Sequence, residues 1–501
     1  MRRLRKRKQR DANKFPAAQL FLLALVRVAE PIALTSIFPY AWKLVLHFHV
    51  GQESKASFYA GLLISAFALA ESITGMFWGG LSDRVGRKPV LLMGCLGTIA
   101  SLLVVGFSGS FWMALAGRFL GGALNGNIGV IQTMVAELVQ NPKHEPYAIM
   151  PFVWSVGTIV GPSIGGLFAM PVKTWPDVFS KGGVFDKFPY LLPNLICVGL
   201  MLISVVAGYF CLEETHPDMQ PWSTASDLAH THAETPIMPA QAGTTTSAAN
   251  LTQPDNGRSR TPSAHSESSS SNSDRVFTKK IIMLTVALGI FTYHSMTYDH
   301  LLPIFFQDER VSPTTILSNV PTGSLAGGLG LSTQRVGLIM SINGLLALLI
   351  QALIFPLIVS YLGVWRTFLA VTLGHPVAYT IVPFLVFVPE RYLYVAIYGC
   401  LFIRNLMAIL AYPLLLILIK EAAPKPSSLG RINGLAASTG AACRTLASPI
   451  AGALYGLGIG VECTGIAWWC SALVAMVGAA QVWEALWMGM EAGREGGERA
   501  W

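Results

Sequence analysis

The stretch GGLSDRVGRKP, from Gly79 to Pro89, decides the fold of this 501-residue chain. It places two glycines, an Asp-Arg pair and an Arg-Lys pair in a short polar segment between two long apolar ones. A short basic loop between apolar segments is typical of the cytoplasmic side of a membrane protein, where Lys and Arg accumulate. An orientation signal needs only the basic residues. The Asp and the two glycines at fixed spacing therefore predict a loop with a function of its own.

The composition is that of an integral membrane protein. The chain is 52% hydrophobic and only 12% charged, with a mean hydropathy of +0.52, whereas soluble domains carry about a quarter charged residues. Its apolar runs exceed the roughly 18 residues that mark a membrane helix. The net charge of +8 does not indicate nucleic-acid binding, because eight basic residues lie within the first fourteen positions. There they would meet anionic lipid headgroups.

We predict an all-α membrane protein with twelve transmembrane helices in two pseudo-symmetric six-helix halves. The spans lie near residues 17–41, 58–80, 89–108, 111–134, 147–170, 190–212, 279–306, 332–358, 367–388, 391–419, 429–456 and 464–488. Lys and Arg concentrate in alternate loops, which places both termini in the cytoplasm. The predicted domains are a basic cytoplasmic tail (1–14), an N-terminal half (15–212), a disordered cytoplasmic linker (213–278), a C-terminal half (279–488) and a cytoplasmic tail (489–501). The linker is rich in Ser, Thr and Pro, too polar to form a core.

Matching positions in the two halves indicate an internal duplication, as in many transporters. The matches are Glu30 and Pro39 with His294 and Pro303, Arg118 with Arg404, the first loop with Pro356-x-x-x-Ser360-Tyr361-x-Gly363, and Gly161-Pro162 with Ser448-Pro449. The second loop keeps the spacing of the first but loses its charges.

These motifs resemble those of the major facilitator superfamily. The polar loop is similar to that between spans 2 and 3 of the family, and we call its matching residues the gating motif: Gly79, Asp83, Arg84, Gly86, Arg87 and Lys88. The resemblance implies that Asp83 contacts cationic and helix-terminal groups of the other half and so closes one face of the protein.

Two further motifs resemble the proton-coupled antiporters of that family. The antiporter motif in span 5 comprises Gly157, Gly161, Pro162, Gly165 and Gly166, and its glycines would let neighbouring helices approach closely. In span 4, Arg118-x-x-x-Gly122-x-x-Asn125 matches a motif whose Arg takes part in proton coupling. The segments RVAEPIALTSIFPY and FPYLLPNL resemble a fungal branch of drug:proton antiporters, related to the plant zinc-induced facilitator-like proteins.

Charged residues inside spans are costly and mark a pathway or an ion pair. We predict proton coupling by Glu30, Arg118, Asp299 and Glu71, with Glu30 first because Pro31 makes its helix irregular. The alternatives are a static Arg27–Glu30 pair, an ion pair at Arg118, and solvated helix ends for Asp299 and Glu71. The predicted substrate cavity contains Arg27, Asn125, His294, Arg404 and Arg444. His294 also fits a packing role.

The predicted function is proton-coupled efflux of a small organic molecule, such as a drug, toxin or metabolite, by alternating access. Four cations against three carboxylates within the spans hint at substrates with anionic or hydrogen-bond-accepting groups. Alternatives are export of a metal chelator or organic anion into the vacuole, and a non-transporting sensor with a transporter fold. We find no phosphate-binding loop or catalytic triad and expect no enzyme activity. We expect no cofactor and no metal site, and a monomer in the plasma membrane rather than the vacuolar membrane.

Overall fold

The computed structural model describes residues 8–9, 16–138, 149–216, 222–223, 278–310, 325, 327–422 and 429–496. The predicted N-terminal tail apart from Lys8 and Gln9, most of the predicted linker, and residues 497–501 lie outside the described residues. Within them the architecture is helical. The one sheet among the described residues pairs β1 (Lys8–Gln9) with β2 (Trp222–Ser223) in parallel.

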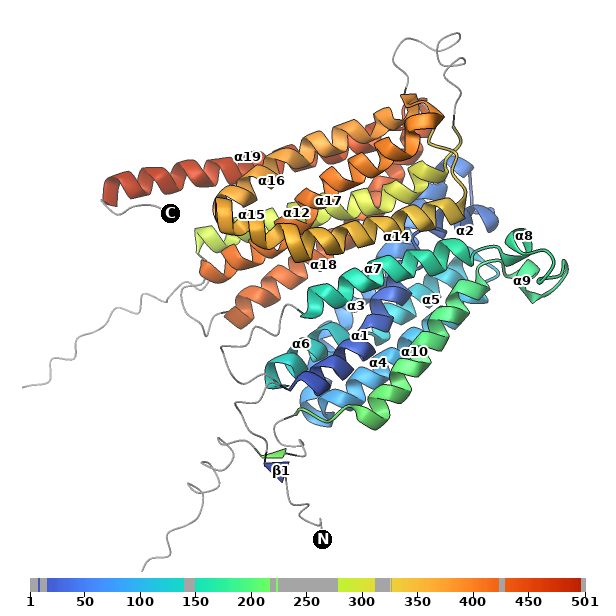
Figure 1. Cartoon of the computed structure of the whole chain (residues 1–501), viewed down its shortest axis with the longest axis horizontal. Coiled ribbons are helices and arrows are strands. Elements are labelled where there is room, and N and C mark those ends of the chain that lie inside the picture. Colours follow the sequence, from blue (N-terminus) through green and yellow to red (C-terminus); the bar gives the residue numbers. More distant parts are fainter. Residues whose placement is uncertain are drawn as a thin grey trace, which may run out of the picture.

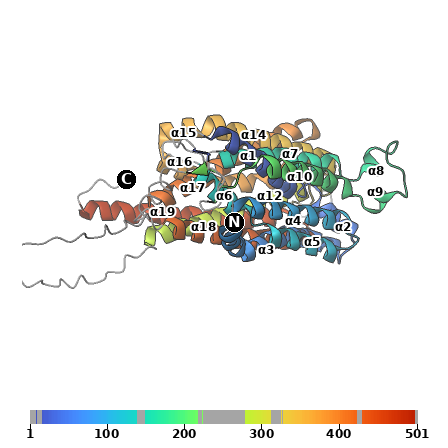
Figure 2. The ribbon, with the colours of Figure 1, turned by 90° about the horizontal axis from the view of Figure 1, so that it is seen from below.

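The N-terminal half begins at α1 and ends after α10. Its helices are α1 (Ala17–Thr35), α2 (Ala41–His47), η1 (Glu53–Lys55), α3 (Ala56–Val85), α4 (Arg87–Gly106), α5 (Phe111–Leu124), α6 (Asn127–Leu138), α7 (Ile149–Leu167), α8 (Pro171–Thr174), α9 (Val184–Lys187) and α10 (Leu191–Cys211). Figure 2 shows α8 and α9 extending beyond the bundle, at the end opposite the C-terminus.

The C-terminal half contains the remaining long helices. They are α12 (Lys279–Gln307), α14 (Thr333–Leu349), the π-helical η3 (Ile350–Ile354), α15 (Phe355–Leu362), α16 (Val364–Ile381), η4 (Val382–Phe387), α17 (Glu390–Glu421), α18 (Leu429–Gly460) and α19 (Gly465–Gly496). Helix α19 continues eight residues past the predicted boundary at 488, since it ends at Gly496.

Helices cover all twelve predicted spans, but two of the predicted spans are wrong as continuous helices. Nine helical segments in the described chain are long and apolar enough to cross a membrane, and Val153–Leu167 is a shorter apolar one. The first span breaks after Thr35, close to Pro39, because proline cannot donate a helical backbone hydrogen bond. The fourth breaks at Asn125, where the Asn127 backbone N–H donates to Asn125 Oδ1 at 3.1 Å and replaces a helical bond.

The two halves pack through two pairs of helices. Helix α3 lies on α18 and α7 on α14, and Figure 1 shows α7 and α14 side by side along the junction. These pairs are spans 2 and 11 and spans 5 and 8, which a two-fold pseudo-symmetry exchanges. Ser57 in α3 donates to the Gly452 carbonyl in α18 at 2.8 Å, and Ser163 in α7 lies 2.5 Å from Ser341 in α14.

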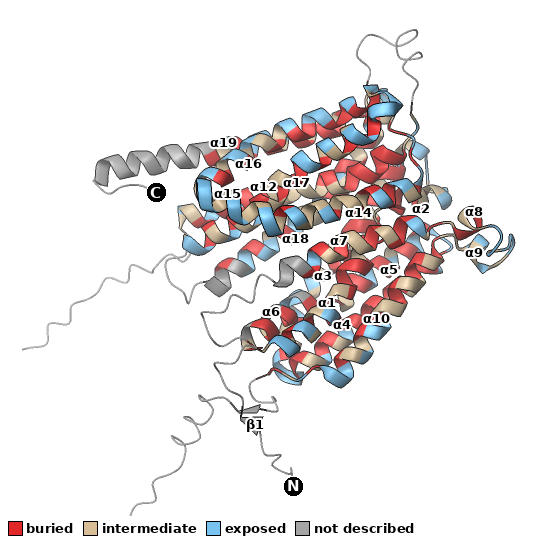
Figure 3. Ribbon diagram, in the orientation of Figure 1, coloured by how far each residue is buried: buried red, intermediate tan, exposed pale blue. Residues whose placement is uncertain are grey.

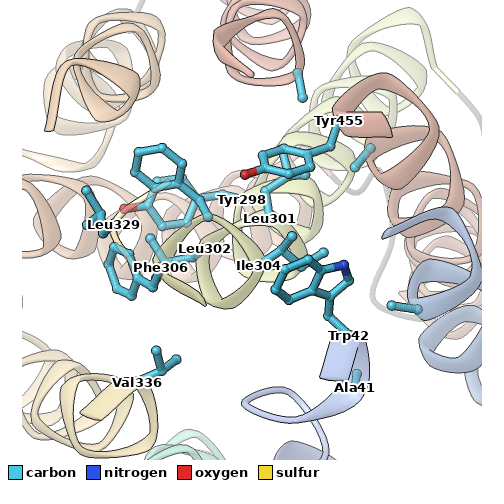
Figure 4. Close-up of a cluster of buried hydrophobic side chains, with 14 of the residues drawn as sticks. Ala41, Trp42, Tyr298, Leu301, Leu302, Ile304, Phe306, Leu329, Val336 and Tyr455 are labelled. Atoms are coloured by element: carbon cyan, nitrogen blue, oxygen red, sulfur yellow. The ribbon is translucent and has the colours of Figure 1, made fainter. Parts of the chain in front are cut away.

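The cores show which end of the protein is closed. At the end formed by α2 and the start of α3, one hydrophobic cluster contains buried side chains of both halves, including Tyr40, Trp42, Phe305 and Trp468. Figure 4 shows Trp42 beside Ile304 of the other half in this cluster. Toward the opposite end each half has a core of its own. Figure 3 shows that the buried residues lie within the bundles and the exposed ones around their outside.

Candidate functional site

The gating motif forms a tight corner between α3 and α4. Gly86 adopts a φ of +107°, a conformation that side chains rarely allow, and this lets α4 begin at the next residue. The Arg87 guanidinium forms a salt bridge with Asp83 and donates to Ser82 Oγ at 2.7 Å and to Glu137 Oε1 at 3.1 Å. At the matching corner before α16, Gly363 likewise adopts a positive φ, of +79°.

Glu214, shortly after the end of α10, binds the backbone of this corner. Its carboxylate accepts the backbone N–H groups of Arg87 at 2.9 Å and Lys88 at 3.1 Å, at the positive end of the α4 dipole. Lys88 Nζ in turn donates to the Leu212 carbonyl at 2.6 Å. Residues 213–216 are therefore packed on the N-terminal half, although we placed them in the linker. Neither Glu214 nor Glu137 was predicted from the sequence; the acidic pair Glu213-Glu214 directly after the apolar span was the available signal for Glu214.

Among the described residues, Asp83 has no side-chain hydrogen bond or salt bridge with the other half. Its side chain is 64% exposed, and its salt-bridge partner among the described residues is Arg87 of its own half. The contact implied by the family resemblance is thus not formed with a described residue of the other half, and it stays a prediction. On this side the described hydrophobic side chains form two separate cores, one in each half.

The antiporter motif brings α7 against α1 and α14. A side chain on Gly157 would meet Pro31, one on Gly161 would meet Thr35, and one on Gly166 would meet the Gly337 backbone of the other half. Thr35 Oγ1 donates to the Gly157 carbonyl at 2.9 Å, which fixes the two helices at this distance. The predicted close approach of neighbouring helices is present.

Glu30 lies in a closed polar cluster inside the N-terminal half. Its side chain is only 1% exposed and pairs with Arg27, one turn earlier in α1. Asn125 Nδ2 donates to Glu30 Oε1 at 2.7 Å, and Asn127 Nδ2 donates to Oε2 at 3.3 Å. The break between α5 and α6 therefore lies where the side chains of Asn125 and Asn127 donate to the Glu30 carboxylate. Arg27 and Asn125, both predicted in the cavity, are buried here.

Arg118 is also buried, but it has no carboxylate partner among the described residues. Its Nε donates to the Leu63 carbonyl at 3.2 Å, and its guanidinium lies 5.0 Å from the Phe67 ring centroid. The described residues thus provide no carboxylate for the alternative of an ion pair at Arg118. Instead a buried cation joins α5 to the backbone of α3.

Asp299 and Arg404 form the corresponding charged pair of the C-terminal half. Arg404 Nη2 donates to Asp299 Oδ1 at 2.7 Å and to Ser295 Oγ at 3.0 Å, and its guanidinium lies 4.4 Å from the Tyr298 ring centroid. The Arg404 side chain is 9% exposed, whereas that of Asp299 is 45% exposed. The carboxylate of this pair is accessible and the guanidinium is not.

Glu71 and Arg444 approach from opposite halves. Both are partly exposed. Glu71 in α3 lies within electrostatic range of Arg444 in α18, and also of Arg27 and Glu30 in α1, without forming a salt bridge in the described structure. Glu71 and Arg444 thus lie on the two helices, α3 and α18, that pack on each other across the junction of the halves.

His294 is buried inside the C-terminal half. Its Nδ1 is 2.8 Å from the Tyr379 hydroxyl and its ring centroid is 5.1 Å from that of His375. A cavity of about 20 Å³ borders both histidines. That volume holds a single water molecule, so this cavity is too small for an organic substrate. The geometry favours the packing role of His294.

Comparison with known proteins gives consistent matches. A family model described as Major Facilitator Superfamily matches residues 20–448. A relative from Aspergillus fumigatus, described as "Major facilitator superfamily multidrug transporter mfsB", is 38% identical over 526 residues, covering 98% of this chain and 86% of its own length. "Protein ZINC INDUCED FACILITATOR 1" from Arabidopsis thaliana is 26% identical over 444 residues, covering 88% and 84%.

A solved structure gives the same fold. The human organic anion transporter MFSD10 aligns with a TM-score of 0.57 at 15% identity, over 93% of this chain and 99% of its own. At that identity the likeness speaks for the fold alone. The family model covers most of the chain, and its motifs occupy the corners and helix contacts described above. The chain belongs to the Major Facilitator Superfamily.

Proposed function

We propose that the protein exports a small organic molecule in exchange for protons by alternating access. Family membership makes the chain a multi-pass membrane transporter of small molecules rather than an enzyme. The finer proposal is supported by the antiporter motif between α1, α7 and α14, and by multidrug transporters among the relatives. We further propose a monomer in the plasma membrane, with both termini cytoplasmic.

The observation that carries the proposal is the difference between the two ends. One end has a single core built from both halves, and the other has two separate cores. The closed end is held by buried polar contacts, including Gln307 Nε2 donating to the Pro39 carbonyl at 2.7 Å. With cytoplasmic termini the closed end would face the outside, and we propose that this conformation is one of the two states that alternating access requires.

We place the exchanged proton on Glu71 rather than Glu30. A proton carrier must be reached by water in turn from each side, and Glu30 is enclosed by Arg27, Asn125 and Asn127. Glu71 is partly exposed and lies in the field of Arg444 from the opposite half. Movement of the halves changes the Glu71–Arg444 distance, and therefore the proton affinity of Glu71. Arg118 and Glu30 maintain the helix geometry around it.

The test compares uphill and downhill transport by Glu71→Gln protein in proteoliposomes. A panel of cationic, neutral and anionic fluorescent dyes first identifies a transported probe with wild-type protein. Glu71→Gln should lose pH-driven uphill efflux but keep counterflow exchange of that probe, because exchange needs no proton cycle. The matched control is Glu390→Gln, which removes an exposed carboxylate at the start of α17. Uphill efflux at the wild-type rate by Glu71→Gln would exclude Glu71 as the carrier.

A further inference from the structure

The charged groups that water can reach between the halves differ from the inventory counted along the sequence. Four cations and three carboxylates lie within the spans, but three of the cations, Arg27, Arg118 and Arg404, are buried. Glu30 is enclosed as well. The accessible set is Asp299, Glu71 and Arg444, and its net charge is negative.

Asp299 faces an internal space rather than lipid. No residue of α12 between Ala287 and Gln307 is exposed, so this stretch of helix is surrounded by protein. The Asp299 side chain nevertheless remains 45% exposed. Its neighbour His300 reaches the other half, with Nε2 3.2 Å from the Ser57 carbonyl. The open side of this carboxylate therefore lies deep in the protein, beside the junction of the halves.

The Asp299–Arg404 pair leaves one carboxylate oxygen accessible to a ligand. Arg404 binds Oδ1, and its own guanidinium is fixed by Ser295 and the Tyr298 ring. Oδ2 has no hydrogen-bond partner among the described residues. Because Arg404 is 9% exposed, a ligand meets the anion of the pair and not the cation. Such an arrangement attracts a positive group and repels a negative one.

From this geometry we infer that Asp299 recognises the positive charge of the transported molecule, and that the substrates are lipophilic organic monocations. This inference rests on the proposed export function and names its substrate class. It reverses the hint of anionic substrates that the count along the sequence gave, because that count included guanidinium groups that are buried. Arg404 is a positioning residue that fixes the carboxylate.

The test uses two probes of nearly equal shape and opposite charge, tetraphenylphosphonium and tetraphenylborate. Binding to purified full-length protein in detergent is measured at equilibrium without any proton gradient. Wild-type protein should bind the phosphonium at least tenfold tighter than the borate. Asp299→Asn should weaken phosphonium binding at least tenfold and leave borate binding unchanged or stronger. Glu390→Gln, which removes an exposed carboxylate at the start of α17, is the matched control and should change phosphonium binding less than threefold.

Two further variants keep the result decisive if Asp299→Asn folds poorly with Arg404 unpaired. Asp299→Glu keeps the charge and should retain phosphonium binding, whereas Asp299→Asn with Arg404→Gln keeps neutrality and should lose it. Preference for the borate, binding of neither probe, or full phosphonium binding by both neutral variants would overturn the inference. Binding without uphill efflux would instead contradict the proposed function and leave the cation site standing, so the two failures are distinguishable.

Discussion

Replacing Glu30 by Gln tests whether its cluster is a structural element of the N-terminal half. Glu30 is 1% exposed and Arg27 is 9% exposed, so both charges are removed from water. Removing one partner of a buried pair leaves the other charge uncompensated, at a cost of about 3–5 kcal/mol. Glu30→Gln should therefore lower the free energy of unfolding by about that amount, which is roughly a 150-fold to 5,000-fold change in the folding equilibrium.

The assay is reversible unfolding in mixed micelles, with transport measured on the same preparations. The rescue variant combines Arg27→Leu with Glu30→Gln. It removes the stranded charge but keeps an amide oxygen to accept from Asn125, which donates to Glu30 at 2.7 Å in the native protein. Replacing a buried pair as a whole is often nearly neutral, so this variant should recover most of the lost stability.

The matched comparison is Asp299→Asn, because that pair is open on the carboxylate side. Its loss of stability should be smaller, since the Arg404 guanidinium keeps its contacts with Ser295 and Tyr298. A Glu30→Gln protein within about 1 kcal/mol of wild type would refute the reasoning. If it also lacked uphill efflux, Glu30 would return as the proton carrier in place of Glu71.

Three further predictions concern the two ends of the protein. Asp83→Asn should reach the membrane but transport well below wild type at equal surface expression; unchanged transport would make the loop an orientation signal only. Gln307→Ala strands buried polar partners and should weaken the closed end by about 1–3 kcal/mol, seen as longer spin-label distances across that end. Burial raises the pKa of Asp308 in the closed state, so closure should gain stability as pH falls through that raised value. The same labels should show no such pH response in Asp308→Asn. The titratable groups facing this carboxylate are Lys43, Glu309 and Tyr455.

Much of the fold follows from patterns that are local in sequence. Apolar run length predicts the spans, and glycine spacing predicts the corner at Gly86 and the close contacts of α7. The accessibility of a charge is different, because it depends on which helices surround it after folding. Arg404 and Asp299 look equally intramembrane in the sequence, yet one is 9% exposed and the other 45%. Two partners of Arg87, Glu137 and Glu214, also lie far from it in the sequence, so their roles were not predictable from the loop itself.

The contacts at the two ends bear on how the chain could support the two conformations of similar free energy that the proposed alternating access requires. In the proposed cycle, closing the other end would take Asp83 from Arg87 to the partners in the other half that the family resemblance implies. Their salt bridge is exposed on the Asp83 side, and such pairs contribute only about 0–1 kcal/mol. Arg87 does not become unpaired in the exchange, because Ser82 and Glu137 still accept from its guanidinium. The cost of releasing Asp83 is therefore small, and a modest difference in proton or substrate binding is sufficient to move the equilibrium between the two states.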